Sequence, residues 1–439
     1  MNESFAGLIA ELKSIALARP VGRVAGLSGG LVQVTGLSRD AALGDRVSLA
    51  GPRGTLCGEV LALSPEALTV LPESPAEGVG IGDPVLHLGT ETVAPDDSWI
   101  GRLIDANGAA LDGRPLRRGP MARPLRASPP PAVERRALGQ RLETGVAIFN
   151  TLLPLVRGQR IGLFAGSGVG KSTLLAKFAR HVQADVAVIG LVGERGREVR
   201  EFVDHVLGPA GLARSVVVAA TSDQSPLLRR RAALTAMTVA EHFRDRGQHV
   251  LLLMDSVTRF AEAHREIALA AGESASLRGF PPSTSQMIMG LGERAGPGRN
   301  GQGDITAVFS VLVAGSDMEE PVADILRGVL DGHVVMDRRI AERGRFPAID
   351  LLRSVSRSLP AAASDAENAL ISRARQLLGA YDRAEMMIQS GLYVPGSDAM
   401  IDAAIRVWPR LDAFLAEDER DGTIQSFGRL SRCLSEANG

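Results

Sequence analysis

The alternation of hydrophobic and polar positions divides the chain into distinct stretches. Residues 1–18 carry apolar residues at helical spacing, which predicts a short amphipathic helix. Residues 19–92 hold short β-type runs that end on Gly, Pro and Asp turns, as in a small antiparallel barrel. Residues 351–439 lack such runs, and their long amphipathic segments predict a helical domain.

The stretch between them, residues 93–350, alternates apolar runs with amphipathic segments. This order is typical of a parallel sheet covered by helices, so the predicted fold class is α/β. Residues 93–135 are expected to form a connector with turns and a stiff proline-rich part. A helix that ends near Gly158 is expected to follow it. A later helix carries Arg229, Arg230 and Arg231, which are expected on a solvated face.

Composition narrows the class of protein. With 439 residues, 45% of them hydrophobic and 23% charged, the chain is expected to form roughly two or three globular domains. It has no apolar run of about 18 residues and no leader pattern, and Cys57 and Cys433 lack metal-ligand spacing, so we expect a cytoplasmic protein with reduced thiols. The net charge of −1 and a single aromatic in residues 1–98, Phe5, argue against specific nucleic-acid binding.

The segment Arg160–Phe178 joins a short apolar run, a glycine-rich loop and an amphipathic segment. The loop matches the phosphate-binding P-loop, except that its first position is Ala165 rather than Gly. A small residue serves there, because that position makes no obligatory phosphate contact. The residues expected around the phosphates are Ala165, Gly166, Ser167, Gly168, Val169, Gly170, Lys171, Ser172 and Thr173. Lys171 is expected to reach the β- and γ-phosphates and Ser172 to hold Mg²⁺; the alternative is an ordinary glycine-rich turn.

Carboxylates follow two of the apolar runs, at predicted strand ends, where ligands bind in such sheets. Asp255 is expected to be a Mg²⁺ partner, and a helix cap is the alternative. Glu194 is expected to orient and polarise the attacking water. A second Gly-Glu-Arg triplet makes Glu293 a competitor for this role. No apolar run precedes that triplet, so the pattern favours Glu194.

Several segments together resemble a known family. They are FAGSGVGKS, GERGREVREF (Gly193–Phe202), VLLLMDSVTRFA (Val250–Ala261) and DILRGVLDGHVVMDR (Asp324–Arg338). The chain after residue 20 is similar to the ATPases of type III protein export, which include the flagellum-specific ATPase and its virulence-secretion relatives. These in turn resemble the α and β subunits of rotary ATP synthases. The resemblance implies a β-barrel, a RecA-like P-loop core and a C-terminal helical domain, assembled as a ring of six.

The resemblance also implies roles for charged residues. It makes Glu194 the water-activating base and places Arg195 and Arg259 near the phosphates. It makes Arg357 an arginine finger that reaches into the neighbouring subunit's site, whereas without the resemblance a surface salt bridge is the expected role. Because Glu194 and Arg357 lie on one chain, a homo-oligomer has complete sites at every interface.

Two aromatic residues receive base-binding roles from the same resemblance. Phe346 matches an aromatic that stacks on adenine, and Tyr393 is expected to cover the other face of the base. A place in the hydrophobic core is the alternative for both side chains.

The expected function is Mg²⁺-dependent ATP hydrolysis by a homohexamer that drives release and unfolding of export substrates at a flagellar export apparatus. The expected partners are regulatory and gate proteins of that apparatus, its substrates and their chaperones. Through them the protein is expected to associate with the inner face of the cytoplasmic membrane. The alternatives are a virulence-secretion ATPase, a Rho-type RNA translocase and a rotary-synthase subunit. The flagellar choice rests on its being the commoner system.

Overall fold

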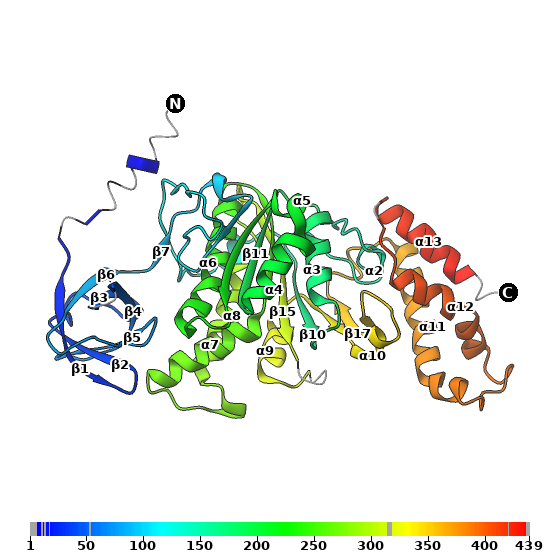
Figure 1. The fold of residues 1–439 in the computed structure, drawn as a ribbon. Helices are drawn as coiled ribbons and strands as arrows, with labels where there is room; N and C mark the ends of the chain where they lie inside the picture. The colour runs from blue at the N-terminus through cyan, green and yellow to red at the C-terminus, as the bar shows by residue number, and fades with distance from the viewer. Residues whose placement is uncertain are drawn as a thin grey trace.

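The computed structural model describes residues 7–9, 12, 15–16, 18–51, 54–313, 318–419 and 421–435. They form a barrel, a central sheet domain and a helical domain, in chain order (Figure 1). Of the helix predicted over residues 1–18, residues 7–9 and 12 are helical, and much of the remainder lies outside the described residues. Within the described ranges, every helix is too short or too polar to span a bilayer. The predicted fold class is confirmed.

The first domain is a closed antiparallel barrel with the strand order β1-β2-β5-β4-β3-β6. Its strands are β1 (Val21–Ser28), β2 (Leu31–Thr35), β3 (Arg46–Gly51), β4 (Gly54–Leu63), β5 (Leu68–Pro72) and β6 (Pro84–Gly89). Inward valine and leucine side chains, such as Val34, Leu49 and Val70, fill it with a core of its own. Closure leaves no free strand edge, which suits a domain built from short strands.

The second domain contains a nine-stranded sheet with the order β17-β16-β10-β15-β13-β11-β12-β8, and β14 pairs with β15. The strands are β8 (Arg102–Ile104), β10 (Arg160–Ala165), β11 (Val186–Glu194), β12 (Ser215–Thr221), β13 (His249–Asp255), β14 (Gly296–Pro297), β15 (Asp304–Leu312), β16 (Gly332–Met336) and β17 (Ile349–Ser356). From β16 to β8 all neighbours on this path are parallel, whereas β17 runs antiparallel to β16. A parallel sheet buried on both faces needs continuous apolar strands, which explains the unbroken runs in the sequence.

Helices cover both faces of this sheet (Figure 1). On one face lie α3 (Lys171–His181), α4 (Gly196–Glu201) and α5 (Gly208–Leu212), and on the other α6 (Pro226–Asp245), α7 (Val257–Ala270), α8 (Pro282–Arg294) and α9 (Pro321–Val329). Phe178 anchors the first layer and Phe243 and Phe260 the second. Because the strands from β16 to β8 are parallel, they all end at one edge of the sheet, called the carboxyl edge here. They all begin at the opposite edge, called the amino edge.

The third domain packs three helices against each other and against the α3 side of the sheet. They are α11 (Asp365–Gln389), α12 (Ala399–Leu415) and α13 (Thr423–Ser435), and their buried residues are continuous with the core around α3. A capping box fixes the start of α11, with Ser364 N donating to Glu367 Oε2 at 2.8 Å. Tyr381 of α11 and Trp408 of α12 stack with ring centroids 4.1 Å apart.

The prediction of a helix that ends near Gly158 is wrong. Helix α2 covers Ala147–Asn150 alone, and Thr151 leaves helical geometry at φ −128° and ψ −79°. Pro154 follows and has no N–H to continue a helical ladder. The buried Asn150 instead accepts hydrogen bonds from the Thr144 backbone N–H at 3.0 Å and hydroxyl at 2.9 Å. Local hydrogen bonding by these polar side chains favours a buried turn over the predicted helix.

The expectation of a solvated face at Arg229–Arg231 is also wrong for two of its members. Arg230 and Arg231 are buried where α6 meets the barrel. Arg230 Nη2 lies 2.5 Å from Glu59 Oε2, and Arg231 Nη1 lies 2.5 Å from Glu73 Oε1. Burial alone raises the pKa of Glu59, but the nearby arginines, Arg230 first among them, together hold that pKa below its usual value. The partners lie on the barrel, far away in sequence, so helical periodicity gives no sign of them.

Candidate active site

The predicted phosphate loop connects β10 to α3 at the carboxyl edge of the sheet. Gly168 and Gly170 adopt φ values of 77° and 86°, which other residues rarely adopt. Val169 is buried and anchors the loop on the core. The exposed residues of this turn are Ser167, Gly168, Ser172 and Thr173. Backbone N–H groups and the start of α3 are therefore open to an anion such as a phosphate.

Three predicted charged residues meet beside this loop. Asp255 ends β13 and Glu194 ends the adjacent strand β11. Lys171, the first residue of α3, forms a short ion pair with Asp255, and its Nζ lies 3.9 Å from Glu194 Oε1. Asp255 Oδ1 also accepts a hydrogen bond of 2.6 Å from the hydroxyl of Ser310 on β15. The structure thus brings Lys171, Glu194 and Asp255 together at the carboxyl edge.

The surroundings of Glu194 make its carboxyl group a stronger base than a free one. Burial raises the pKa of Glu194 to about 7, and the charge of Asp255 adds to this effect. Lys171 opposes the rise, whereas a hydrogen bond and the charge of Glu198 on α4 increase it further. A general base is most effective when its pKa lies near the working pH.

Arg195 and Arg259, both predicted near the phosphates, flank the end of β11. Arg195 precedes α4 and is largely exposed, with its Nη1 3.5 Å from Glu198 Oε1. Arg259 lies in the first turn of α7 and packs against Gly193, where a Cβ would stand 3.0 Å from the Arg259 Cβ. Its guanidinium donates to Glu262 Oε2 at 2.8 Å, which raises the pKa of Arg259. Both side chains lie close enough to the strand end to serve a ligand at Glu194.

The two predicted base-contacting aromatics lie in different places. Phe346 is 48% exposed, and its Cδ1 lies 3.1 Å from where a Cβ on Gly170 would stand, so its ring covers the end of the phosphate loop. Tyr393 belongs to the connection between α11 and α12, where its hydroxyl donates to Asp402 Oδ1 at 2.9 Å. Its hydroxyl also donates to the backbone carbonyl oxygen of Asp398 at 3.1 Å, so the ring is held against the start of α12. Within one chain the structure does not bring Tyr393 to Phe346, and its base-binding role stays a prediction.

Arg357 lies at the amino edge of the sheet. Strand β17 runs antiparallel to β16, so its last residue pairs with the first residue of β16. The phosphate loop leaves β10 beside the last residue of β16. At about 3.3 Å per residue, this places Arg357 roughly 20 Å along the sheet from its own phosphate loop. The side chain is exposed, and its Nη2 donates to the carbonyl oxygen of Arg327 at 3.1 Å.

The second Gly-Glu-Arg triplet is also at the amino edge. Glu293 Oε1 lies 2.7 Å from Nη1 of Arg160, the first residue of β10, and Glu293 Oε2 lies 3.0 Å from Arg135 Nη1. The following Arg294 is buried and forms an ion pair of 2.6 Å with Glu241 on α6. This triplet therefore ties secondary-structure elements together, and it lies away from the phosphate loop.

The oxygen donors at the carboxyl edge suit Mg²⁺. Ser172 offers an exposed hydroxyl, and Asp255 offers a carboxylate in a spot where two acids face one lysine. Mg²⁺ prefers oxygen ligands and is usually held by one or two side chains together with substrate phosphates. In the described part of the chain no group of three or more His, Cys, Asp and Glu could cage a metal. The donor set therefore fits an ion that arrives with the nucleotide.

Ser310 and Glu198 are contacts of the site that sequence reasoning missed. Ser310 is fully buried, and it interrupts the apolar run of β15, which was a usable signal. Glu198 lies on the charged helix α4 that follows β11, and the turn from strand to helix brings its side chain to Glu194. Neither was predicted, because Ser310 lies inside a strand and Glu198 inside a helix, whereas the prediction considered residues at strand ends.

Fold and site together define a class: a P-loop nucleoside triphosphatase with a barrel before its sheet and helices after it. Family comparison agrees with this class. The profile of the "ATP synthase alpha/beta family, nucleotide-binding domain" matches residues 145–356. That of the "T3SS EscN ATPase C-terminal domain" matches residues 363–424.

Whole-chain comparisons give the family. The chain is similar to the "Flagellum-specific ATP synthase" of Caulobacter vibrioides, with 45% identity over 97% of this chain and 98% of the relative. It is 42% identical to the "Type 3 secretion system ATPase" of Pseudomonas syringae pv. syringae, over 87% of this chain and 86% of that one. The assembled ATPase EscN of enteropathogenic E. coli superposes with a TM-score of 0.87 at 36% identity, covering 94% of this chain and 100% of EscN. The chain belongs to the family of flagellar and type III secretion ATPases, and its activity is ATP hydrolysis.

Proposed function

We propose that Glu194 is the general base of this ATPase and that Lys171 holds the β- and γ-phosphates. The meeting of Lys171, Glu194 and Asp255 beside an open phosphate loop is the observation that carries the proposal. A carboxylate with a pKa near 7 can take a proton from a water molecule aligned with the γ-phosphate. Arg195 and Arg259 stand at the rim, where guanidinium groups can contact phosphate oxygens.

The Mg²⁺ of the bound nucleotide is assigned to Ser172 and Asp255. When bound, the ion neutralises charge on the β- and γ-phosphate oxygens. Ser310 donates to Asp255 and so fixes the orientation of its carboxylate. The ammonium of Lys171 forms an ion pair with the same carboxylate.

The active form is proposed to be a homohexameric ring with sites shared between subunits. Arg357 lies at the sheet edge opposite its own phosphate loop and is exposed, so it can complete only a neighbour's site. An arginine supplied in this way stabilises the charge on the transferring phosphoryl group. EscN, a relative with 36% identity, was solved in an assembled form, which supports a ring for this chain as well.

The biological role proposed is to energise release and unfolding of export substrates from chaperones at a flagellar export apparatus. The identity of 45% to a flagellum-specific relative over 97% of the chain supports the flagellar choice. EscN was solved in complex with its central stalk EscO, so a stalk protein is one proposed partner of this ring. Contacts with regulatory and gate proteins would hold it at the inner face of the membrane.

Specific activity measured against protein concentration tests the shared sites. We expect the turnover per subunit to rise steeply as rings form and then to level off. A turnover that stays constant across the range in which size-exclusion chromatography shows ring assembly would contradict shared sites.

A deletion strain of the encoding organism tests the biological role. We expect loss of swimming motility, restored by the wild-type gene but not by Glu194→Gln. Glu293→Gln serves as the matched control and is expected to restore motility. Normal swimming by the deletion strain would reject the flagellar role and leave the ATPase activity unaffected.

A further inference from the structure

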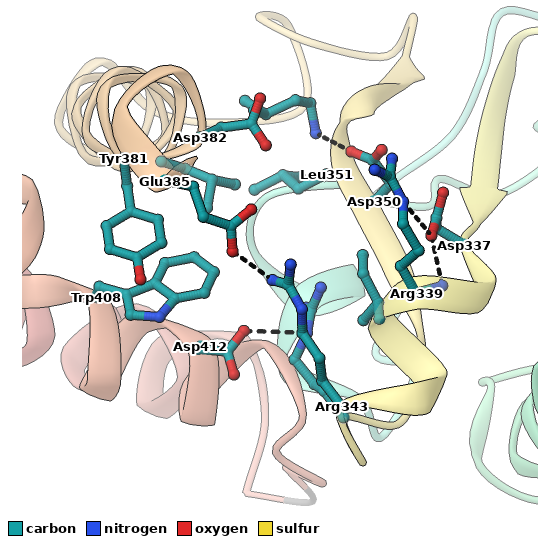
Figure 2. Close-up of a pocket in the computed structure, with 14 residues that line it drawn as sticks. Asp337, Arg339, Arg343, Asp350, Leu351, Tyr381, Asp382, Glu385, Trp408 and Asp412 are labelled. Atoms are coloured by element: carbon teal, nitrogen blue, oxygen red, sulfur yellow. Dashed lines mark hydrogen bonds and ion pairs between the residues drawn. The ribbon is translucent and has the colours of Figure 1, made fainter. Parts of the chain in front are cut away.

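The loop that carries Phe346 is tied to the C-terminal helices by two arginines that precede this residue, Arg343 and Arg345. It runs from the end of α10 (Arg338–Glu342) to the start of β17. Arg345 Nε lies 3.1 Å from Asp412 Oδ1 on α12, and Arg343 Nη1 lies 2.7 Å from Glu385 Oε1 on α11. Figure 2 shows both ion pairs reaching across one cavity from the sheet domain to the helices.

Arg345 forms the more buried of the two links. Its side chain is 9% exposed, and its Nη2 also donates to the backbone carbonyl oxygen of Ile349 at 2.9 Å. The guanidinium thus bridges the end of the loop and helix α12. Its Nη1 is buried without a hydrogen-bond partner among the described residues, so Asp412 is the carboxylate on which the orientation of this group depends.

A cavity with many charged side chains lies beside this link. It has a volume of about 110 Å³, enough for a few water molecules. Its charged lining consists of Asp337, Arg339, Arg343, Arg345, Asp350, Asp382, Glu385 and Asp412. The stacked rings of Tyr381 and Trp408 hold α11 against α12 beside it, so the carboxylates of both helices move together (Figure 2).

At its other end the loop covers the phosphate loop. The Phe346 ring lies against Gly170, directly before Lys171. A displacement of the backbone at Arg345 moves the next residue with it, because the peptide unit between them is planar and short. The position of the ring over the nucleotide site is therefore linked through Arg345 to Asp412.

We propose that Arg345 is a positioning residue that uses Asp412 of the C-terminal domain to hold Phe346 over the nucleotide site. The C-terminal helices thereby set the affinity for the base of the nucleotide, while the affinity for its phosphates stays with the P-loop. By linkage, a nucleotide base under Phe346 favours the arrangement of α12 in which the ion pair is closed. The inference rests on the proposed ATPase function and on the contact between Phe346 and the base that the family resemblance implies.

Steady-state kinetics of Asp412→Asn in the full-length protein test this inference. We expect the KM for ATP to rise about 10-fold with kcat nearly unchanged. Competitive inhibition by Mg²⁺-tripolyphosphate, which has no base, should keep its inhibition constant. Asp418→Asn is the matched control, because it breaks the 2.6 Å ion pair between Lys177 and Asp418, which also joins the sheet domain to the C-terminal region. It should leave the KM unchanged.

A double-mutant cycle with Phe346→Ala separates the inference from its premise. If Phe346→Ala raises the KM and Asp412→Asn adds nothing in that background, the inference holds. If Asp412→Asn raises the KM equally in both backgrounds, or weakens tripolyphosphate binding as well, Arg345 does not act through Phe346. A KM that Phe346→Ala leaves unchanged rejects the base contact itself. Should Asp412→Asn fail to fold, Glu385→Gln, which breaks the more exposed pair, must raise the KM in part, and an unchanged KM overturns the inference.

Discussion

The two edges of the central sheet use the same kinds of residue for opposite purposes. At the carboxyl edge Glu194 and Asp255 share one cation, Lys171, beside an open loop. At the amino edge the carboxylates have arginine partners in excess: Glu293 pairs with Arg135 and Arg160. A carboxylate held between two guanidinium groups is a structural link, whereas one of two acids facing a single lysine is available for chemistry.

Arg357 is the exception at the amino edge. It donates to a backbone carbonyl oxygen rather than to a carboxylate, and its side chain is exposed. A guanidinium of this kind can still pair with phosphate. In the proposed ring the two edges are therefore complementary, because the amino edge of one copy meets the carboxyl edge of the next.

The largest effect is expected from Arg357→Ala. Removing an arginine that stabilises the transferring phosphoryl group should lower kcat by about 10³–10⁵-fold. Nucleotide binding by the isolated subunit, followed with a fluorescent ATP analogue, should stay unchanged. Arg299→Ala, which removes another half-exposed arginine that precedes β15 at the same edge, is the control and should retain activity. Equal losses in both variants would point to damaged structure instead.

The next largest effect on kcat is expected from substitutions in the two Gly-Glu-Arg triplets. Glu194→Gln should lower kcat by about 10²–10⁴-fold and keep nucleotide affinity, because an amide cannot accept the proton of water. Glu293→Gln should keep kcat and lower thermal stability, since it weakens a link to Arg160. Normal turnover by Glu194→Gln would reverse the assignment of the two edges.

Ser310 offers a smaller effect at the carboxyl edge. Ser310→Ala removes a hydrogen bond to a charged group, worth about 1.5–3 kcal/mol, so kcat/KM should fall roughly 10–100-fold. Ser310→Thr keeps the hydroxyl and should recover most of the rate. In Mg²⁺ titrations of nucleotide binding, Ser310→Thr should shift the curve less than Ser310→Ala. Equal rates in the two variants would show that the hydroxyl has no role.

The smallest effect is a shift in pH dependence. Because the pKa of Glu194 is raised to about 7, the base is protonated below that pH, and kcat/KM should rise with pH and level off above about 7. Glu198→Gln removes a neighbour that raises this pKa, so the acidic limb should move to lower pH. Glu201→Gln, at an exposed position of the same helix, should leave the profile in place. Profiles that coincide in all three proteins would exclude Glu198 as a tuning group.

The positions of the charged residues at the carboxyl edge were predictable, because each of them follows a local sequence pattern. Lys171 ends a glycine-rich loop, and Asp255 and Glu194 end unbroken apolar strands. Strand ends are readable from periodicity, and parallel strands collect those ends in one place.

The amino edge and the domain contacts were not predictable in the same way. Arg230, Arg231 and Arg345 look like solvated charges until the fold brings Glu59, Glu73 and Asp412 to them. A buried ion pair between distant segments does not change the hydrophobic periodicity of the sequence. Its members are charged residues, which usually lie at the protein surface.

Mixing two inactive variants tests the shared site most directly. Glu194→Gln retains Arg357, and Arg357→Ala retains Glu194, so a mixed ring contains interfaces at which both residues are intact. Random assembly at equal amounts makes about one interface in four complete, and the account predicts that ATPase activity returns to roughly that fraction of the wild-type rate. If mixed rings, verified by labelled subunits, stay as inactive as either variant alone, Glu194 and Arg357 do not complete one site across the interface.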